Sequence, residues 1–246
     1  MTTLPNTLEE AIAQAREATK TALNNGCTKL QVQLIFPEIA LQSQSIAQQF
    51  IPLFTEQLGV QPKVFFPDAG AAALARRDWG TVSFKIDDVG SPRTPIEDKI
   101  QPEDEAFLLV APSAVEVVQV EKMSNLAGDR PFILLNPQME DIYVVGIGYA
   151  ARQIRDRFLS TIESCYYLRP LETAAIMRSY PSVWQVWLKT DDEYQLIAEE
   201  SQRPAGEALD QLLAKASGTN TSGETTPSTK PGLLANLQRF LNALSR

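Results

Sequence analysis

The sequence predicts an α/β protein: a doubly wound, mostly parallel sheet extended by a C-terminal antiparallel meander, plus a tethered amphipathic helix. Short apolar runs alternate with segments of helical period through the first part of the chain, as in a parallel sheet covered on both faces. Four strand-like runs joined by short turns follow, which is typical of a meander. A polar linker then precedes a final apolar stripe of helical spacing.

The first helix is predicted from Leu8, because apolar residues recur there at helical spacing after Asn6 and Thr7, which provide a cap. Gly26 ends this helix. Strands are expected next at residues 30–36, 63–66, 81–86, 106–111 and 132–135, and helices at residues 41–58, 69–75 and 115–126.

The second half is predicted to begin with a helix at residues 149–159. The meander strands are expected at residues 164–171, 174–180, 183–189 and 194–199, and a helix with Leu209, Leu212 and Leu213 on its inner face closes the domain at residues 205–216. The predicted organisation is therefore an α/β domain (1–216), a flexible linker (217–231) and an amphipathic helix (232–246).

Composition excludes several function classes. The 246 residues carry 22 Lys and Arg against 30 Asp and Glu, a formal charge of −8, and no histidine. The absence of histidine excludes Ser-His and Cys-His nucleophile pairs, general acid–base catalysis by histidine, and histidine-ligated metals. The acidic balance disfavours nucleic acid. Two cysteines, Cys27 and Cys165, favour a reducing compartment and are interpreted as buried small residues.

Targeting signals are also absent from the sequence. The first residues lack a signal-peptide pattern, and no apolar run approaches the roughly 20 residues of a membrane span. A cytoplasmic protein, peripheral at most to a membrane, is expected.

Four predicted strands end in proline followed by a polar residue. In a parallel sheet these ends share one edge, where ligands of open α/β folds bind. The alternative is that proline terminates each strand and the polar residue caps the next helix. Capping is the favoured interpretation for these pairs: Pro37-Glu38, Pro67-Asp68, Pro112-Ser113 and Pro137-Gln138.

A glycine motif offers an enzymatic alternative. Gly146, Gly148 and Ala151 fit G-x-G-x-x-A between a strand-like run and a helix, as in a dinucleotide phosphate loop. The motif lies late in the chain, and tight glycine packing is favoured, so no cofactor is predicted. The acidic clusters at 87–88, 103–105, 191–193 and 199–200 are interpreted as solvated turns, and no metal site is predicted.

The terminal helix is the predicted partner-binding element. Its apolar face fits a partner's groove or its own domain, and its few basic residues disfavour lipid. Trp184 and Trp187 fall on opposite faces of one strand, so one is expected to pack into the core, and the other is either covered by a helix or exposed for a partner. The predicted binding residues are Leu233, Leu237, Phe240, Leu241, Leu244 and Trp187.

Hydrophobic and proline landmarks recur at residues 5–15, 30–37, 65–75, 107–112, 131–137, 166–171, 178–187 and 203–204. Together these segments resemble a cyanobacterial and chloroplast family that includes the plant low photosystem II accumulation protein. The resemblance implies an α/β domain that acts at the photosynthetic (thylakoid) membrane as a non-enzymatic assembly factor. It brings no catalytic residues. A protein-binding factor for photosystem complexes is therefore the leading hypothesis, and a nucleotide-binding enzyme is the alternative.

Overall fold

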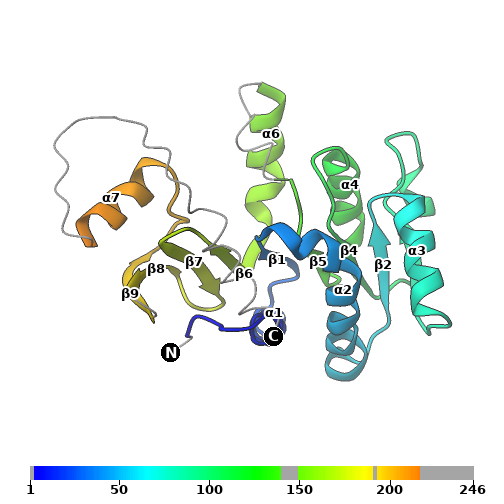
Figure 1. The fold of residues 1–246 in the computed structure, drawn as a ribbon. Coiled ribbons are helices and arrows are strands. Elements are labelled where there is room, and N and C mark those ends of the chain that lie inside the picture. Colours follow the sequence, from blue (N-terminus) through cyan, green and yellow to red (C-terminus); the bar gives the residue numbers. More distant parts are fainter. Residues whose placement is uncertain (1–2, 140–148, 191–192, 217–246) are drawn as a thin grey trace.

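The computed structural model describes residues 3–139, 149–190 and 193–216, in which nine strands form one sheet (Figure 1). The strand order is β3-β2-β4-β5-β1-β6-β7-β8-β9, and the first six in that order are parallel neighbours. The parallel strands are β1 (Lys29–Leu34), β2 (Pro62–Phe66), β3 (Lys85–Asp88), β4 (Ala106–Val110), β5 (Phe132–Leu135) and β6 (Glu163–Pro170). The predicted α/β fold with a mostly parallel sheet is confirmed, and the predicted linker and tethered helix at residues 217–246 lie outside the described residues.

One face of the sheet is covered by three helices: α1 (Leu8–Asn24), α2 (Ser43–Pro52) and α3 (Ala69–Trp79). The α1 helix starts where the sequence predicts, because the Thr7 side chain accepts the Glu10 N–H at 3.1 Å. Its small inner residues, such as Ala11 and Ala15, are fully buried and let the helix lie close to the sheet.

The opposite face carries α4 (Val117–Ala127), α6 (Tyr149–Arg157) and a short 3-10 helix, η3 (Ile96–Asp98). Side chains of β4 alternate between the two cores, with Leu108 in the first and Phe107 and Leu109 in the second. Every side chain of β4 is buried, as expected for a strand covered on both faces.

The predicted helix over residues 41–58 is instead three segments. A 3-10 helix, η1 (Pro37–Gln42), precedes α2, and a π-helix, η2 (Leu53–Leu58), follows it. Pro52 has no N–H to continue the α-helical ladder, so the winding changes immediately after it. Gly59, with φ of +68°, ends this region.

The predicted strand at residues 81–86 is also shifted. The strand that pairs with β2 is β3, residues 85–88, in a register that sets Lys63 opposite Lys85 and Phe66 opposite Asp88. The apolar residue Phe84 lies outside the strand and packs on Trp79, with ring centroids 6.0 Å apart. Ring packing accounts for its hydrophobicity.

The meander is confirmed as β7 (Ala174–Ser179), β8 (Trp184–Thr190) and β9 (Glu193–Glu200), in which each strand is antiparallel to its neighbour and β7 is antiparallel to β6. A final described helix, α7 (Glu207–Ala216), follows β9. Its expected inner residues Leu209, Leu212 and Leu213 are only half-buried. The last helix of the domain thus covers the sheet loosely.

Candidate functional sites at the sheet edge and sheet face

The four strand ends marked by proline lie at one edge of the parallel sheet, as expected. Asp68 caps α3, since its Oδ1 accepts the Ala71 N–H at 2.9 Å. Ser113 shapes the turn before α4, because its hydroxyl donates to Glu116 Oε2 at 2.6 Å and accepts the Val115 N–H. The capping interpretation is therefore confirmed for Asp68, while Ser113 acts one turn earlier than a helix cap.

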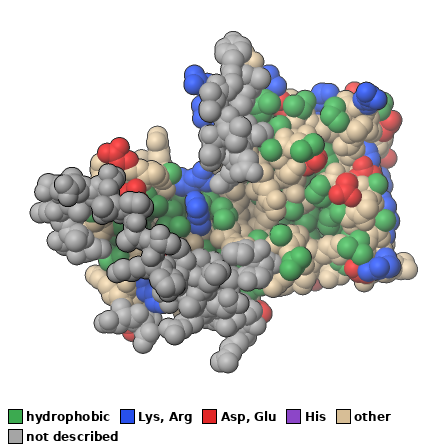
Figure 2. Space-filling model, turned by 45° about the horizontal axis from the view of Figure 1, so that its top comes forward, with side chains coloured by type: hydrophobic (Ala, Val, Ile, Leu, Met, Phe, Trp, Pro, Cys, Tyr) green, Lys and Arg blue, Asp and Glu red, His purple; other side chains and the backbone are tan. Residues whose placement is uncertain are grey.

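A pocket of about 420 Å³ opens at this carboxyl edge, beside the ends of β2, β3 and β4. The chain leaves β2 toward α3 on one face and leaves β4 toward α4 on the other. Neighbouring strands whose connections diverge in this way create the crevice in which α/β proteins bind ligands. Figure 2, which turns the top of Figure 1 forward, shows hydrophobic side chains among acidic and other polar ones on this part of the surface.

Asn136 connects β5 and β1 at the same edge. Its Oδ1 accepts the Leu34 N–H at 2.8 Å, and its own N–H donates to Val32 O at 2.7 Å. The residue is 7% exposed and has a φ of +49°, a left-handed conformation that asparagine tolerates better than most side chains. Asn136 thus fixes the spacing of two central strands where they end.

A second pocket, of about 230 Å³, lies on the face of β1 opposite α1, over Gln31 and Gln33. Trp184 and Arg203 form part of its wall together with apolar side chains. Tyr167 packs edge-on against Trp184, with centroids 5.0 Å apart, and the Arg203 guanidinium lies 5.4 Å from the Tyr167 ring. This pocket joins a polar floor to a cationic and aromatic wall.

Sequence reasoning did not single out this second pocket. The sequence feature that could have revealed it is the alternation of Gln31 and Gln33 with Leu30, Val32 and Leu34. A central strand covered on both faces is usually apolar throughout, so this alternation indicates a polar face on β1. Arg203 comes three residues after the end of β9 and 170 residues after Gln33, so only the fold brings it to β1.

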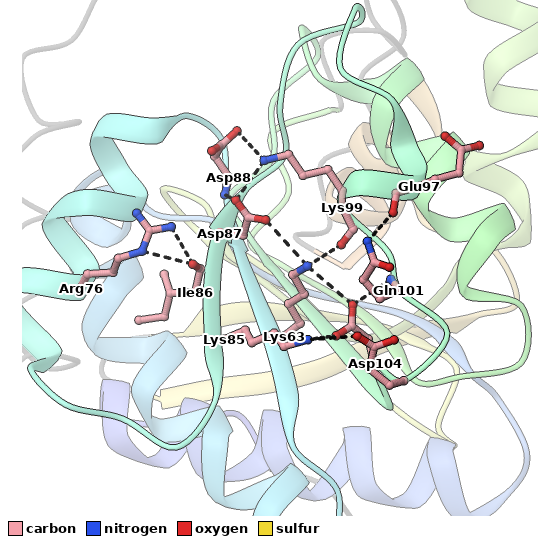
Figure 3. A network of polar contacts seen from close by, with 11 residues as sticks. Lys63, Arg76, Lys85, Ile86, Asp87, Asp88, Glu97, Lys99, Gln101 and Asp104 are labelled. Carbon is pink, nitrogen blue, oxygen red and sulfur yellow. Dashed lines mark hydrogen bonds and ion pairs between the residues drawn. The ribbon is translucent and has the colours of Figure 1, made fainter.

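A buried network of ion pairs lies on the α4 face of β2 and β3 (Figure 3). Lys63, 6% exposed, donates to Lys99 O at 2.7 Å and lies 3.7 Å from Asp87 and 3.6 Å from Asp104. Lys99 bonds Asp87 at 2.9 Å and Asp88 at 3.3 Å. These contacts join both strands to the connection between β3 and β4, residues 89–105.

Asp104 is the buried carboxylate of this network, at 6% exposure. Burial, the largest single influence, opposes its ionisation. A backbone N–H from Gln101, a hydrogen bond from Lys85 and the charges of Lys63 and Lys85 outweigh it and lower the Asp104 pKa. The interpretation of residues 87–88 and 103–105 as solvated turns is therefore wrong for Asp87, Asp88 and Asp104.

Comparison with known families adds one finding. A family described as "Domain of unknown function (DUF1995)" matches residues 5–211 of this chain. The chain belongs to the DUF1995 family.

The DUF1995 match contains both pockets and the ion-pair network, and it ends before the predicted linker at residues 217–231. The part of this chain that the family matches is thus the α/β domain. The predicted binding residues Leu233, Leu237, Phe240, Leu241 and Leu244 lie outside the described residues and outside the match.

The other predicted site residues are placed as follows. Trp184 and Trp187 lie on opposite faces of β8, as expected: Trp184 packs on Tyr167 and Trp187 packs half-buried against the α1-side core. The Trp187 indole Nε1 is buried and has no acceptor within the described chain. Gly146 and Gly148 lie outside the described residues, and Ala151 belongs to α6.

The cysteines of this DUF1995 chain differ in burial. Cys165 is fully buried beside the Thr19 hydroxyl, and desolvation raises the pKa of its thiol to about 12. A thiol held protonated is a poor nucleophile. The interpretation of Cys165 as a small core residue is confirmed, whereas Cys27 is only half-buried.

Across residues 3–139, 149–190 and 193–216, no group of acidic or cysteine side chains is arranged to hold a metal ion. Within the same residues, no helix combines the length and the apolar character needed to cross a membrane.

Proposed function

We propose that this chain is a non-enzymatic protein-binding factor that acts in the assembly or maintenance of photosynthetic membrane complexes of the photosystem II type. It would work from the cytoplasmic side, at the surface of the thylakoid membrane. The resemblance to the low photosystem II accumulation protein supports a role in photosystem assembly. The family match over residues 5–211 supports assigning this role to the α/β domain.

The observation that carries the protein-binding role is a pair of exposed apolar side chains at the carboxyl edge. Leu41 is 90% exposed in η1, after β1, and Val115 is 81% exposed before α4, after β4. These are the two most exposed large apolar side chains of the described residues. Large apolar side chains held on short, hydrogen-bonded turns lose little conformational entropy on binding, which favours a docking contact.

The first test replaces both side chains. The Leu41→Asp/Val115→Asp variant and the unchanged chain are each immobilised and exposed to detergent-solubilised thylakoid membranes. The variant should capture about one tenth as much photosystem II protein as the unchanged chain, or less. Its melting temperature should hardly change, because both positions are solvent-exposed. Quantitative mass spectrometry of the retained subunits measures the effect.

The matched control is Leu126→Asp. Leu126 is 40% exposed at the far end of α4, so the substitution adds one negative charge away from the carboxyl edge, against two at the edge in the double variant. Equal loss of capture by the control, or full capture by the double variant, would contradict the role of this edge.

The second test concerns the terminal helix. Changing Leu237 and Leu241 to Asp should abolish capture while leaving the melting temperature almost unchanged, since an isolated helix this short is marginal in water until it meets a surface. A marked fall in melting temperature would instead place the helix in the core of the domain, and intact capture would place the partner surface on the domain alone.

A further inference from the structure

The pocket over Gln31 and Gln33, called the β1 pocket below, lies beside two neighbouring strands whose connections diverge. From β1 the chain continues to α2, which packs on the α1 side of the sheet, and from β5 it continues to α6, which packs on the other side. Because β5 and β1 are paired, the topology itself opens a crevice where these two strands end. Pro137 and Met139, which follow β5, line the pocket at this place.

The charge of the β1 pocket favours an anion. Arg203 is the one charged residue among the described residues that line it. The nearby Arg178, which lies 5.5 Å from the Trp184 ring, is paired with Glu163 and so adds no net charge. The Arg203 guanidinium carries five N–H donors, so it can bind an oxyanion in addition to its existing contacts. One cation in a largely apolar pocket selects a ligand with a single anionic end.

The floor supplies hydrogen-bonding groups where a central strand is usually apolar. Gln31 and Gln33 lie on the face of β1 opposite α1, and Gln33 is only 3% exposed. Amides on the covered face of a strand are costly unless they are hydrogen-bonded. Each amide has two N–H donors beside its carbonyl oxygen, so an oxyanion in the pocket meets donors on the floor as well as at Arg203.

The floor and walls of the β1 pocket are held in place before a ligand binds. The floor strand β1 pairs with β5 on one side and with β6 on the other. Gln138 N–H donates to Pro112 O at 2.7 Å, which fixes the segment after β5. Trp184 is held edge-on against Tyr167. A preformed pocket avoids much of the ordering cost of binding.

We propose that the β1 pocket binds the carboxylate of a small ligand whose body is apolar. The carboxylate pairs with Arg203 and accepts from the Gln31 amide, since its oxygens are acceptors only. The apolar body lies against Leu159, Ile162 and the Trp184 ring.

The size of the β1 pocket limits the ligand. Its volume of about 230 Å³ is below the roughly 300–1,000 Å³ of sites for drug-sized ligands, so it takes a small molecule or the end of a longer one. The source of the carboxylate is therefore either a free small acid or the carboxyl terminus of a partner protein that ends in an apolar residue.

The test titrates the full chain with 3-phenylpropionate, with N-acetyl-phenylalanine as a mimic of a protein carboxyl terminus, and with N-acetyl-phenylalaninamide as the neutral control. Backbone amide shifts are followed by NMR. Both carboxylates should bind saturably with dissociation constants of about 1 mM or tighter, shifting the amides of the lining residues, and the neutral control should bind at least about tenfold more weakly. Tighter binding of 3-phenylpropionate assigns a free acid, and equal or tighter binding of N-acetyl-phenylalanine assigns a protein carboxyl terminus.

Three variants sharpen the test. Arg203→Gln should weaken the binding of both carboxylates about tenfold without changing the weak binding of the neutral control. Gln31→Leu removes one floor amide and should weaken the carboxylates about threefold or more. Both side chains are only half-buried, so the fold should be kept, which the melting temperature checks. Arg77→Gln removes the same charge from a side chain that is 73% exposed at the end of α3, and it should leave every affinity unchanged.

Three outcomes would overturn the proposal: no saturable carboxylate binding at about 10 mM, equal binding of N-acetyl-phenylalanine and its amide, or equal effects of Arg203→Gln and Arg77→Gln. Tighter binding of inorganic phosphate than of either carboxylate would also overturn it, by assigning Arg203 to a phosphoryl group. Because binding is measured on the isolated chain, its failure would leave the capture experiments above unaffected.

Discussion

The Lys63→Met variant is expected to lose about 3–5 kcal/mol of the free energy of unfolding, measured by urea denaturation at neutral pH. The substitution keeps much of the aliphatic stem, so the loss reports the ammonium group. Without it, the 6% exposed Asp104 retains only Lys85 and the Gln101 N–H as partners, and Lys99 O loses its donor.

The control for this variant is Lys85→Met, which removes the same charge from a side chain that is 57% exposed. We expect a loss of about 1 kcal/mol or less, because solvent screens exposed pairs. If Lys63→Met were as mild as Lys85→Met, the network would contribute little and β2 would be held by its apolar contacts alone. Adding Asp104→Asn to Lys63→Met should recover part of the loss by removing the unbalanced charge.

The effect of Lys63→Met should also depend on pH. The pKa of Asp104 is lowered in the folded state. Its ionised carboxylate therefore stabilises the fold at every pH above the ordinary pKa of an aspartate, and this stabilisation is lost as the pH falls through the folded-state pKa. The difference in stability between the unchanged chain and Lys63→Met should therefore be largest near neutrality and shrink in acid. A constant difference would show that Asp104 is not the partner that matters.

Asn136→Ala is expected to lower the free energy of unfolding by about 2–4 kcal/mol. The variant leaves the buried Leu34 N–H without its acceptor, at about 1–3 kcal/mol, and places alanine at a φ of +49°, at about 1 kcal/mol. Asn136→Gly loses the same hydrogen bond and tolerates the same φ, so it should be milder by about 1 kcal/mol.

Urea denaturation of the two variants separates the two causes. Equal losses in Ala and Gly would show that the left-handed backbone costs nothing here, and losses below about 1 kcal/mol in both would show that the bridge between β5 and β1 is not stabilising.

The sequence by itself determined the elements whose causes are local. The Thr7 cap and the apolar spacing after Leu8 predict α1, and the alternation of short apolar runs with helical segments predicts the parallel sheet with its meander. It also predicted that the strand ends marked by proline share one edge, because parallel strands end on the same side. The Asp68 cap follows from its position between Pro67 and an alanine-rich helix.

Only the tertiary structure decided the features that depend on strand order. Because β2 lies between β3 and β4, Lys63 is brought close to Asp87 and Asp104. These two residues, which the sequence predicts to lie in solvated turns, are therefore ion-pair partners of a buried lysine. The same order brings residues that follow β2 and β4, such as Asp68 and Gln119, to the lining of one pocket. Such pairings join residues from different elements, and their energies arise from burial, which local spacing does not specify.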